Sequence, residues 1–256
     1  LRSASTRDLM VHDPVNDVEF FFLRPRDIAI YVGEGTLDLG ITGRDMLLDS
    51  GAKADEVLSL GFAPSTFRFA APPGLAASPS DLEGRTIATS YAGVLEEWLA
   101  RHAISARVVE LDGAVENAVA LGVADAVADV VATGTTLRRA GLEIVGDPIL
   151  VSEALLVRRT GAPQVPAVET FVRRLQGVMV ARSYVLVDYD IRTEKLDAAC
   201  AMTPGIESPT ISSLHDPQWS AVRAMVPSTD VHQIMDDLYE LGARGILVTD
   251  IHACRL

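Results

Sequence analysis

The pattern of hydrophobic residues predicts two parts of this chain with different orders of strands and helices. Through residues 9–157, short apolar runs alternate with stretches in which apolar residues recur every three or four positions. The runs predict strands, and the periodic stretches predict helices. The predicted strands are 18–23, 37–42, 67–71, 86–89, 107–111, 126–131 and about 148–157, and the predicted helices are 26–32, 45–50, 94–102 and 115–121. This alternation predicts mostly parallel sheets.

The rhythm changes after a helix predicted over 168–181, which follows the break at Gly161-Ala162-Pro163. From there the order is strand, helix, two strands, helix and strand, which is the order of a ferredoxin-like unit. Its predicted strands are 184–188, 210–212, 219–226 and 245–251, and its predicted helices are 193–201 and a helix to Leu241. Residues 228–230 supply an N-cap for the second helix, and Gly242 ends it.

We therefore predict an α/β protein whose first part resembles the two lobes of periplasmic solute-binding proteins and whose C-terminal part is a ferredoxin-like (βαββαβ) domain. Lobe I takes residues 1–63 with a returning segment of about 151–183, lobe II takes residues 64–150, and the last domain takes residues 184–256. Such sheets bind ligands in a cleft at the carboxyl ends of their strands. The fold alone does not name the ligand.

Composition narrows the classes of function. With 256 residues, 48% of them hydrophobic, the chain can form two or three compact units. A formal net charge of −13 argues against a general nucleic-acid or membrane surface, although a few local arginines can still bind an anionic substrate. The two cysteines, Cys200 and Cys254, and the five scattered histidines give neither a disulfide framework nor zinc spacing. We expect a cytoplasmic protein, since neither an export signal nor a membrane-spanning run is visible.

Residues 116–137 carry the strongest chemical signal. The apolar run 126–131 contains Asp129 and is followed by Thr133-Gly134-Thr135-Thr136. A strand, a tight loop and a helix start direct backbone N–H groups into one concavity, where the helix N-terminus favours a phosphate. Asp129 could hold sugar hydroxyls or a metal ion. Taken alone, such a loop is more often an ordinary turn with a threonine N-cap. Asp129 could likewise be an ordinary cap at the end of a strand.

The complete spacing resembles that of ATP phosphoribosyltransferase, the first enzyme of histidine biosynthesis. The matching positions are Glu116, Gly122, Ala124, Val127, Asp129-Val130 and Thr133-Gly134-Thr135-Thr136-Leu137. Residues 13–16, 22–27 and 37–45 are similar to the family's catalytic part, while 203–210 and 246–255 are similar to the regulatory domain of its long form, as in actinobacteria. In the family a strand, a basic loop and a helix precede the position of Arg7-Asp8-Leu9, and this sequence, which starts at Leu1, contains none of them.

The resemblance implies that N1 of ATP attacks C1 of phosphoribosyl pyrophosphate, giving N1-(5-phosphoribosyl)-ATP and pyrophosphate. The protein would position both substrates and stabilise charge, while Mg²⁺ neutralises the leaving group. Glu116 and Asp129 would bind ribose hydroxyls or metal-bound water, although Glu116 could serve only the helix dipole. The 5-phosphate would lie on Thr133, Gly134, Thr135 and Thr136.

The nucleotide would meet a second set of side chains, from lobe I. Arginine suits bidentate phosphate contact, and the segments at 24–26 and 42–45 come where the resemblance places the cleft. The expected contacts are Arg24, Arg26, Thr42, Arg44 and Asp45. Arginines in loops are often only solvated, and Asp45 could be an N-cap. One departure from the family follows Tyr91, where Ala92-Gly93-Val94-Leu95-Glu96-Glu97 replaces a proline and a basic residue.

The resemblance of the last domain to the regulatory domain of the long form implies feedback inhibition by L-histidine and assembly of homodimers into a homohexamer. The expected histidine contacts are Asp190, Ile206, Thr210 and Gly245. An alternative is that the prolines and Gly205 of the 203–210 loop only shape a connection, and that Asp190 caps a helix.

Other classes of function remain open at this point. An inactive nucleotide or amino-acid binding module of the same fold is one alternative. A common-type phosphoribosyltransferase is another, but its loop normally has two adjacent acidic residues, whereas Ala128 precedes Asp129 here.

Overall fold

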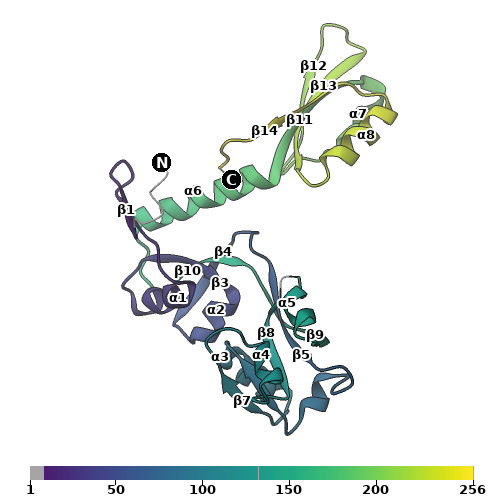
Figure 1. Cartoon of the computed structure of the whole chain (residues 1–256). Helices are drawn as coiled ribbons and strands as arrows, with labels where there is room; N and C mark the ends of the chain where they lie inside the picture. Colours follow the sequence, from purple (N-terminus) through teal and green to yellow (C-terminus); the bar gives the residue numbers. More distant parts are fainter. Residues whose placement is uncertain (1–8, 132, 256) are drawn as a thin grey trace. The chain divides into compact units, whose positions relative to one another are not determined.

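The computed structural model describes residues 9–131 and 133–255, so Arg7 and Asp8 lie outside the described residues. The chain splits into two compact units, Leu1–Pro163 and Gln164–Leu256 (Figure 1). Helix α6 (Pro166–Ser183) falls in the second unit, whereas the sequence-based scheme assigns residues 164–183 to lobe I. The three-domain division therefore stays a prediction.

The first lobe of unit 1 is built on a three-stranded sheet in the order β3-β10-β4, in which both pairs are antiparallel. Two helices pack with this sheet around a small core that includes Ala29, Val32 and Leu155. A separate antiparallel hairpin, β1 with β2, precedes it. The elements are β1 (Met10–Asp13), β2 (Val18–Phe21), α1 (Pro25–Glu34), β3 (Leu39–Gly43), α2 (Arg44–Ser50), β4 (Ala54–Ser59) and β10 (Ala154–Arg159).

The second lobe is a five-stranded sheet in the order β7-β6-β8-β5-β9. Apolar side chains of α3 pack with Phe67 and Phe69 on one face, and those of the α4 and α5 region pack with Val127 and Val131 on the other. The elements are β5 (Ser65–Ala71), the 3₁₀ turn η1 (Pro79–Leu82), β6 (Thr86–Thr89), α3 (Ala92–Arg101), β7 (Arg107–Glu110), α4 (Asn117–Ala120), β8 (Ala126–Val131), α5 (Thr135–Arg139) and β9 (Glu143–Ser152).

The prediction of mostly parallel sheets is wrong. Only β7, β6 and β8 run parallel in the second lobe, since β5 is antiparallel to both β8 and β9. The alternation of strands and helices along a chain does not reveal which strands become neighbours, and the returning strand β10 enters lobe I between β3 and β4. Strand β4 was not predicted either, because Asp55 and Glu56 interrupt its apolar pattern.

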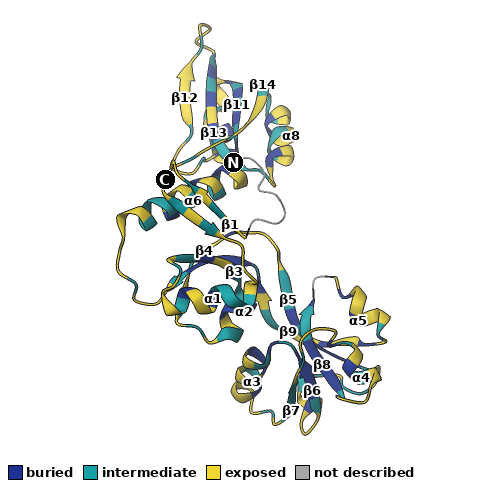
Figure 2. Ribbon diagram, turned by 60° about the vertical axis from the view of Figure 1, so that its left-hand side comes forward, coloured by how far each residue is buried: buried dark blue, intermediate teal, exposed yellow. Residues whose placement is uncertain are grey.

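Unit 2 has the predicted ferredoxin-like order. Its four strands form one antiparallel sheet in the order β12-β13-β11-β14, and helices α7 and α8 pack on one face. Burial alternates along β11 and β13, as expected for a sheet covered on one side (Figure 2). After α6 the elements are β11 (Tyr184–Arg192), η2 (Thr193–Lys195), α7 (Leu196–Met202), β12 (Thr210–Ser213), β13 (Trp219–Pro227), α8 (Val231–Leu241) and β14 (Arg244–Asp250). The predicted fold class is thus confirmed.

A buried pair of hydroxyls ties the central strand of unit 2 to the loop after α7. The Tyr189 hydroxyl lies 2.8 Å from Oγ1 of Thr203, which donates to the carbonyl of Ala199 at 3.1 Å. Tyr189 is 2% exposed and Thr203 is fully buried. Burial raises the pKa of Tyr189, so its hydroxyl stays protonated and able to donate.

We predict that Thr203→Val destabilises unit 2 by about 1–3 kcal/mol, because the Tyr189 hydroxyl loses its buried partner. Urea unfolding followed by circular dichroism measures the change. The double variant Tyr189→Phe/Thr203→Val should be more stable than Thr203→Val alone, since no unpaired hydroxyl remains. Ser208→Ala, at an exposed position of the same loop, is the control. Simple additivity in the double variant would contradict the coupling.

Candidate active site

A short loop links β8 to α5, and we call residues 133–136 the threonine loop. Gly134 is the N-cap residue of α5 with φ of 70°, a left-handed conformation that favours glycine. The hydroxyls of Thr133 and Thr135 lie 3.1 Å apart, and Thr133, Thr135 and Thr136 are exposed. Leu137 is buried and anchors the helix. The loop therefore presents hydroxyl and N–H donors to solvent, as expected for a phosphate site.

Arg138 braces this loop and was not among the predicted site residues. Its Nη2 donates to the carbonyl of Thr133 at 3.2 Å and lies 3.5 Å from Oγ1 of Thr135. The sequence contains two arginines, Arg138 and Arg139, one residue after the threonine loop. Only the structure shows that the first of them turns back onto the loop.

The two predicted carboxylates lie close enough for the charge of Glu116 to act on Asp129. Asp129 lies within β8, two residues before the strand ends, and accepts a hydrogen bond from the N–H of Val130 at 2.7 Å. Burial raises the pKa of Asp129, and the nearby charge of Glu116 raises it further, against the effect of that hydrogen bond. Glu116 is the N-cap residue of α4 and provides no side-chain cap bond there among the described residues. The pairing places two acidic groups where sugar hydroxyls or a cation would relieve their repulsion.

Arg68 on β5 stands directly opposite Asp129 in the strand register, so both side chains lie on one face of the sheet. Its Nε donates to Oγ1 of Thr66 at 3.0 Å and its Nη1 to the carbonyl of Gly146 at 3.4 Å. Thr66 in turn donates to the carbonyl of Val131, the last residue of β8. The Arg68 guanidinium therefore leans towards the strand end that precedes the threonine loop. Arg68 was not among the predicted site residues, because the hydrophobic pattern does not reveal that β5 pairs with β8.

Tyr91 lies where side chains of both lobes approach one another. Burial raises the pKa of Tyr91 to about 12, with further contributions from the negative charges of Asp45 and Asp129, while Arg26 opposes them. Asp45 is 7% exposed and belongs to α2 of lobe I, whereas Asp129 belongs to lobe II. The charges of two carboxylates, one from each lobe, thus act on a neutral phenol.

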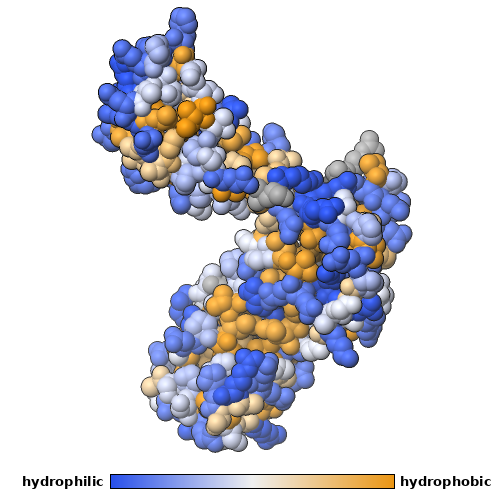
Figure 3. Space-filling model, turned by 180° about the vertical axis from the view of Figure 1, so that it is seen from behind, coloured by the Kyte–Doolittle hydropathy of each residue, from blue (hydrophilic) through white to orange (hydrophobic). Residues whose placement is uncertain are grey.

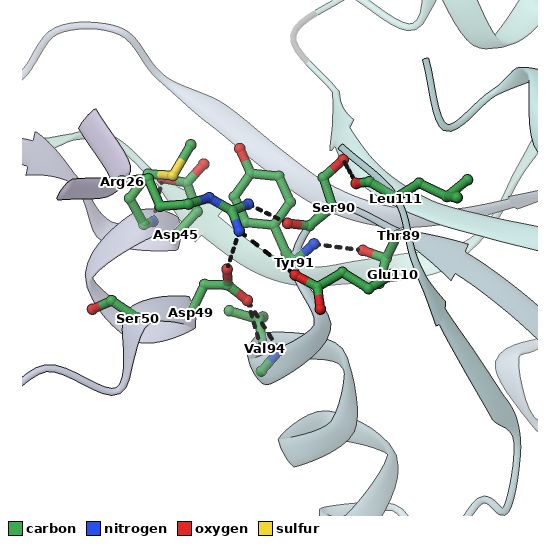
Figure 4. Close-up of polar contacts among 12 residues, drawn as sticks. Arg26, Asp45, Asp49, Ser50, Thr89, Ser90, Tyr91, Val94, Glu110 and Leu111 are labelled. Atoms are coloured by element: carbon green, nitrogen blue, oxygen red, sulfur yellow. Dashed lines mark hydrogen bonds and ion pairs between the residues drawn. The ribbon is translucent and has the colours of Figure 1, made fainter. Parts of the chain in front are cut away.

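Arg26 connects the lobes at the same place (Figure 4). Its Nη2 donates to the carbonyl of Ser90, and its Nη1 lies 3.6 Å from Asp49 and 3.8 Å from Glu110. The guanidinium also lies 5.8 Å from the centre of the Tyr91 ring. Arg24 lies two residues before Arg26, at the N-cap of α1, and it is exposed.

Thr42 has a structural contact that orients this segment. It is 4% exposed, and its hydroxyl donates to the carbonyl of Pro25 at 2.8 Å. This bond ties the end of β3 to the start of α1, immediately before Arg26. Thr42 can therefore influence a ligand indirectly, because it holds residues 24–26, which we call the arginine turn.

Arg44 is engaged by partners within lobe I and at the crossing between the lobes. Its guanidinium donates two hydrogen bonds to the carboxylate of Glu56, one to that of Glu153 and one to the carbonyl of Val151. The Glu56 partner raises the pKa of Arg44. A nucleotide would have to displace these partners to reach Arg44, and its expected contact with the nucleotide stays a prediction.

The expected histidine contacts lie in unit 2, two of them close together. Asp190 sits inside β11, so the alternative that it caps a helix is wrong. A Cβ built on Gly245 would lie 3.7 Å from Oδ2 of Asp190, which places the two residues side by side. Thr210 pairs with Arg223 on the far side of β13, and Ile206 is 38% exposed in the loop before β12. Asp190 and Thr210 share the sheet face that α7 and α8 leave uncovered, but on strands separated by β13.

Among residues 9–131 and 133–255, no group of three or more His, Cys, Asp and Glu side chains is arranged to hold a metal ion. Asp129 with Glu116 is a fitting donor set for a magnesium ion that is carried mostly by substrate phosphates and water. Within the same described residues, no helix is long and apolar enough to cross a membrane.

The chain is similar to known proteins over nearly all its length. Residues 24–177 match the sequence model of the family described as ATP phosphoribosyltransferase, and residues 181–253 match that of the HisG C-terminal domain. ATP phosphoribosyltransferases of Paenarthrobacter aurescens and Streptomyces coelicolor are 60% and 61% identical, with 98% of this chain and 90% of each relative covered.

A solved structure agrees with the sequence relatives. The ATP phosphoribosyl transferase (HisG:HisZ) complex from Thermotoga maritima contains a chain with a TM-score of 0.59 and 26% identity, over 68% of this chain and 84% of that one. The chain belongs to the ATP phosphoribosyltransferase family of histidine biosynthesis, in a form that includes the HisG C-terminal domain.

Proposed function

We propose that this ATP phosphoribosyltransferase holds the 5-phosphate of phosphoribosyl pyrophosphate on the threonine loop and its ribose hydroxyls on Asp129 and Glu116. The observation that supports the proposal is the partly buried carboxylate pair beside a loop of exposed threonine hydroxyls. Backbone N–H groups at residues 134–136 and the hydroxyls of Thr133, Thr135 and Thr136 supply the donors. Arg138 keeps this loop in shape through its bonds to Thr133 and Thr135.

The reaction is a substitution at C1 of the ribose. A bond forms between N1 of the adenine and C1, the bond from C1 to the pyrophosphate oxygen breaks, and pyrophosphate leaves with the electron pair. Positive charge develops on the ribose ring in the transition state, so the carboxylates of Asp129 and Glu116 stabilise it electrostatically. The protein needs no covalent nucleophile, because binding both substrates in one cleft supplies the orientation.

Magnesium is the cofactor that fits this donor set. When bound, Mg²⁺ would neutralise the pyrophosphate as it leaves. Asp129 and Glu116 would hold it through one carboxylate or through metal-bound water, and the substrate phosphates would supply its remaining ligands.

We place ATP on the lobe I side of the cleft. Arg24 and Arg26 are suited to its phosphates, Thr42 holds the arginine turn, and Asp45 and Tyr91 lie where the adenine has to approach the ribose. We leave Arg44 out of this set, because its donors are engaged by Glu56, Glu153 and Val151. Its contacts suit a role in holding the crossing between the lobes.

We further propose that unit 2 binds L-histidine and that the protein acts as a homodimer and homohexamer in the cytoplasm. Asp190 would pair with a positively charged group of histidine, with Gly245 beside it. Ile206 and Thr210 lie towards the other edge of the sheet, so a complete site would combine them from different copies of the chain. The edge strands β12 and β14 expose Ile211 and Leu247, and apolar side chains reach the surface of this unit (Figure 3). Such edges are commonly covered by association.

We predict that Asp129→Asn raises the KM for phosphoribosyl pyrophosphate on the order of 10- to 100-fold and leaves the KM for ATP nearly unchanged. One charge-assisted interaction with the ribose side is lost. Initial rates are followed by the ultraviolet absorbance of N1-phosphoribosyl-ATP. Thr66→Ser, a nearby conservative change on β5, is the control. Equal KM values in Asp129→Asn and the parent enzyme would remove Asp129 from the site.

The same variant should be more stable than the parent at neutral pH. The pKa of Asp129 is raised in the folded state, so the folded state binds this proton more tightly than the unfolded state does. Stability therefore falls as pH rises from the usual range of aspartate through the raised value, and the cost persists above it. Asparagine has no charge to bury, so its melting temperature should exceed that of the parent at pH 7 and approach it in acid. A lower melting temperature at pH 7 would contradict this assignment.

We predict that Asp190→Ala abolishes inhibition by L-histidine and leaves kcat within about twofold, because the proposed contact lies outside unit 1. Inhibition curves at fixed substrate concentrations measure the effect. Asp188→Ala is the matched control, since Asp188 lies on the same strand and face but pairs with Arg223 at 2.6 Å. Histidine inhibition that is purely competitive with ATP and unaffected by Asp190→Ala would contradict a distal site.

A further inference from the structure

The two lobes of unit 1 meet at a junction centred on Asp49, a residue that the proposed function leaves without a role. Asp49 is in the last turn of α2, and its side chain is 7% exposed. It faces the start of α3 in the other lobe and Arg26 on its own side (Figure 4). The contacts between the lobes at the cleft therefore include one buried carboxylate.

Asp49 caps α3 from across the junction. Its Oδ1 accepts hydrogen bonds from the N–H groups of Gly93 at 3.0 Å and Val94 at 3.4 Å, in the first turn of that helix. A carboxylate at this position also interacts favourably with the helix dipole. The two bonds fix the Asp49 carboxylate in place and leave Oδ2 directed at Arg26, 3.6 Å from its Nη1.

Gly93 allows this approach. A Cβ at residue 93 would lie 2.8 Å from the backbone oxygen of Asp49, closer than real Cβ contacts. The lack of a side chain at residue 93 therefore lets the cap from lobe I come this close to the first turn of α3.

The other partners of Arg26 differ from Asp49 in exposure. The Arg26 side chain is 43% exposed and that of Glu110 is 64% exposed, so their contact at 3.8 Å is open to solvent and worth little. An incoming phosphate can replace Glu110 at that side of the guanidinium. Asp49 is buried and held by two N–H groups, so it remains as the fixed anchor when the exposed side is occupied.

We propose that Asp49 is a positioning residue for the nucleotide: it holds the Arg26 guanidinium across the junction between α2 and α3, with the exposed side directed at the ATP phosphates. This inference rests on the proposed placement of ATP at Arg26. Asp49 itself does not contact the substrate. It affects the binding of ATP only through the position of Arg26.

The test is a double-mutant cycle between Asp49 and Arg26. Asp49→Asn keeps an oxygen that can accept from Gly93 and Val94 but removes the charge that faces Arg26. We expect a KM for ATP about tenfold higher, with kcat and the KM for phosphoribosyl pyrophosphate within about twofold. In the Arg26→Gln background, Asp49→Asn should have no additional effect on ATP. Calorimetric Kd values for ATP give the same comparison if a variant turns over too slowly.

Two further variants separate this role from a general effect on folding. Gly93→Ala changes no charge but forces Asp49 away from α3, so it should raise the KM for ATP in the same direction as Asp49→Asn. Glu97→Gln, on the same helix and paired only with Arg101 at the surface among the described ion pairs, should leave both KM values unchanged. Melting temperatures of all variants identify any that are unfolded at the assay temperature.

The outcomes distinguish this inference from the proposed function. If Arg26→Gln raises the KM for ATP while Asp49→Asn does not, or if their effects are additive, Asp49 is not a positioning residue and the nucleotide site stands. If neither variant changes the KM for ATP in an active enzyme, ATP does not bind at Arg26, and the role of Asp49 is then wrong as well. If the parent protein forms no N1-phosphoribosyl-ATP, the proposed function itself fails.

Discussion

The joint between the two lobes of unit 1 depends on one nearly continuous strand that runs through both. Strand β9 (Glu143–Ser152) is hydrogen-bonded to β5 in lobe II, and after a single residue β10 (Ala154–Arg159) becomes the central strand of lobe I. The other crossing, between β4 and β5, is bonded to it through Leu60 and Phe62, which pair with Ala154. Any change in the angle between the lobes must bend these two segments. Arg44, the first residue of α2, pairs with Glu153 between β9 and β10 and with Glu56 on β4, so its guanidinium is held by carboxylates at the joint between the lobes.

The site concentrates negative charge that the folded protein tolerates at a cost. Asp129 has a raised pKa next to Glu116, and Tyr91 has a raised pKa because burial and the charges of Asp45 and Asp129 disfavour its ionised form. Substrate binding can relieve this repulsion, since ribose hydroxyls donate to carboxylates and a magnesium ion neutralises them. Positive charge is supplied locally by Arg26, Arg68 and Arg138, which makes an anionic substrate compatible with a net charge of −13.

Hydrogen bonds to backbone atoms give the basic side chains their positions. Arg138 bonds the Thr133 carbonyl, Arg68 the Gly146 carbonyl and Arg26 the Ser90 carbonyl. Each guanidinium is thereby held beside the cleft while part of it stays exposed. Arginine suits this arrangement because its planar group can bond the protein on one edge and a phosphate on another. Asp49 has a similar role in our proposal, because it holds the guanidinium of Arg26 and does not contact the substrate itself.

The sequence by itself determined the local features of this protein. The threonine loop, the start of α5 after Gly134 and the βαββαβ order of unit 2 follow from short-range patterns, because turn residues and periodicity act within a few positions. The motif spacing also identified the family. Tertiary structure decided the partners: that β5 lies beside β8 and brings Arg68 opposite Asp129, that Arg44 is paired with Glu56, and that Asp49 caps a helix of the other lobe. These contacts join residues 12 to 61 positions apart, and their pairing is set by how sheets and lobes pack rather than by any neighbouring residue.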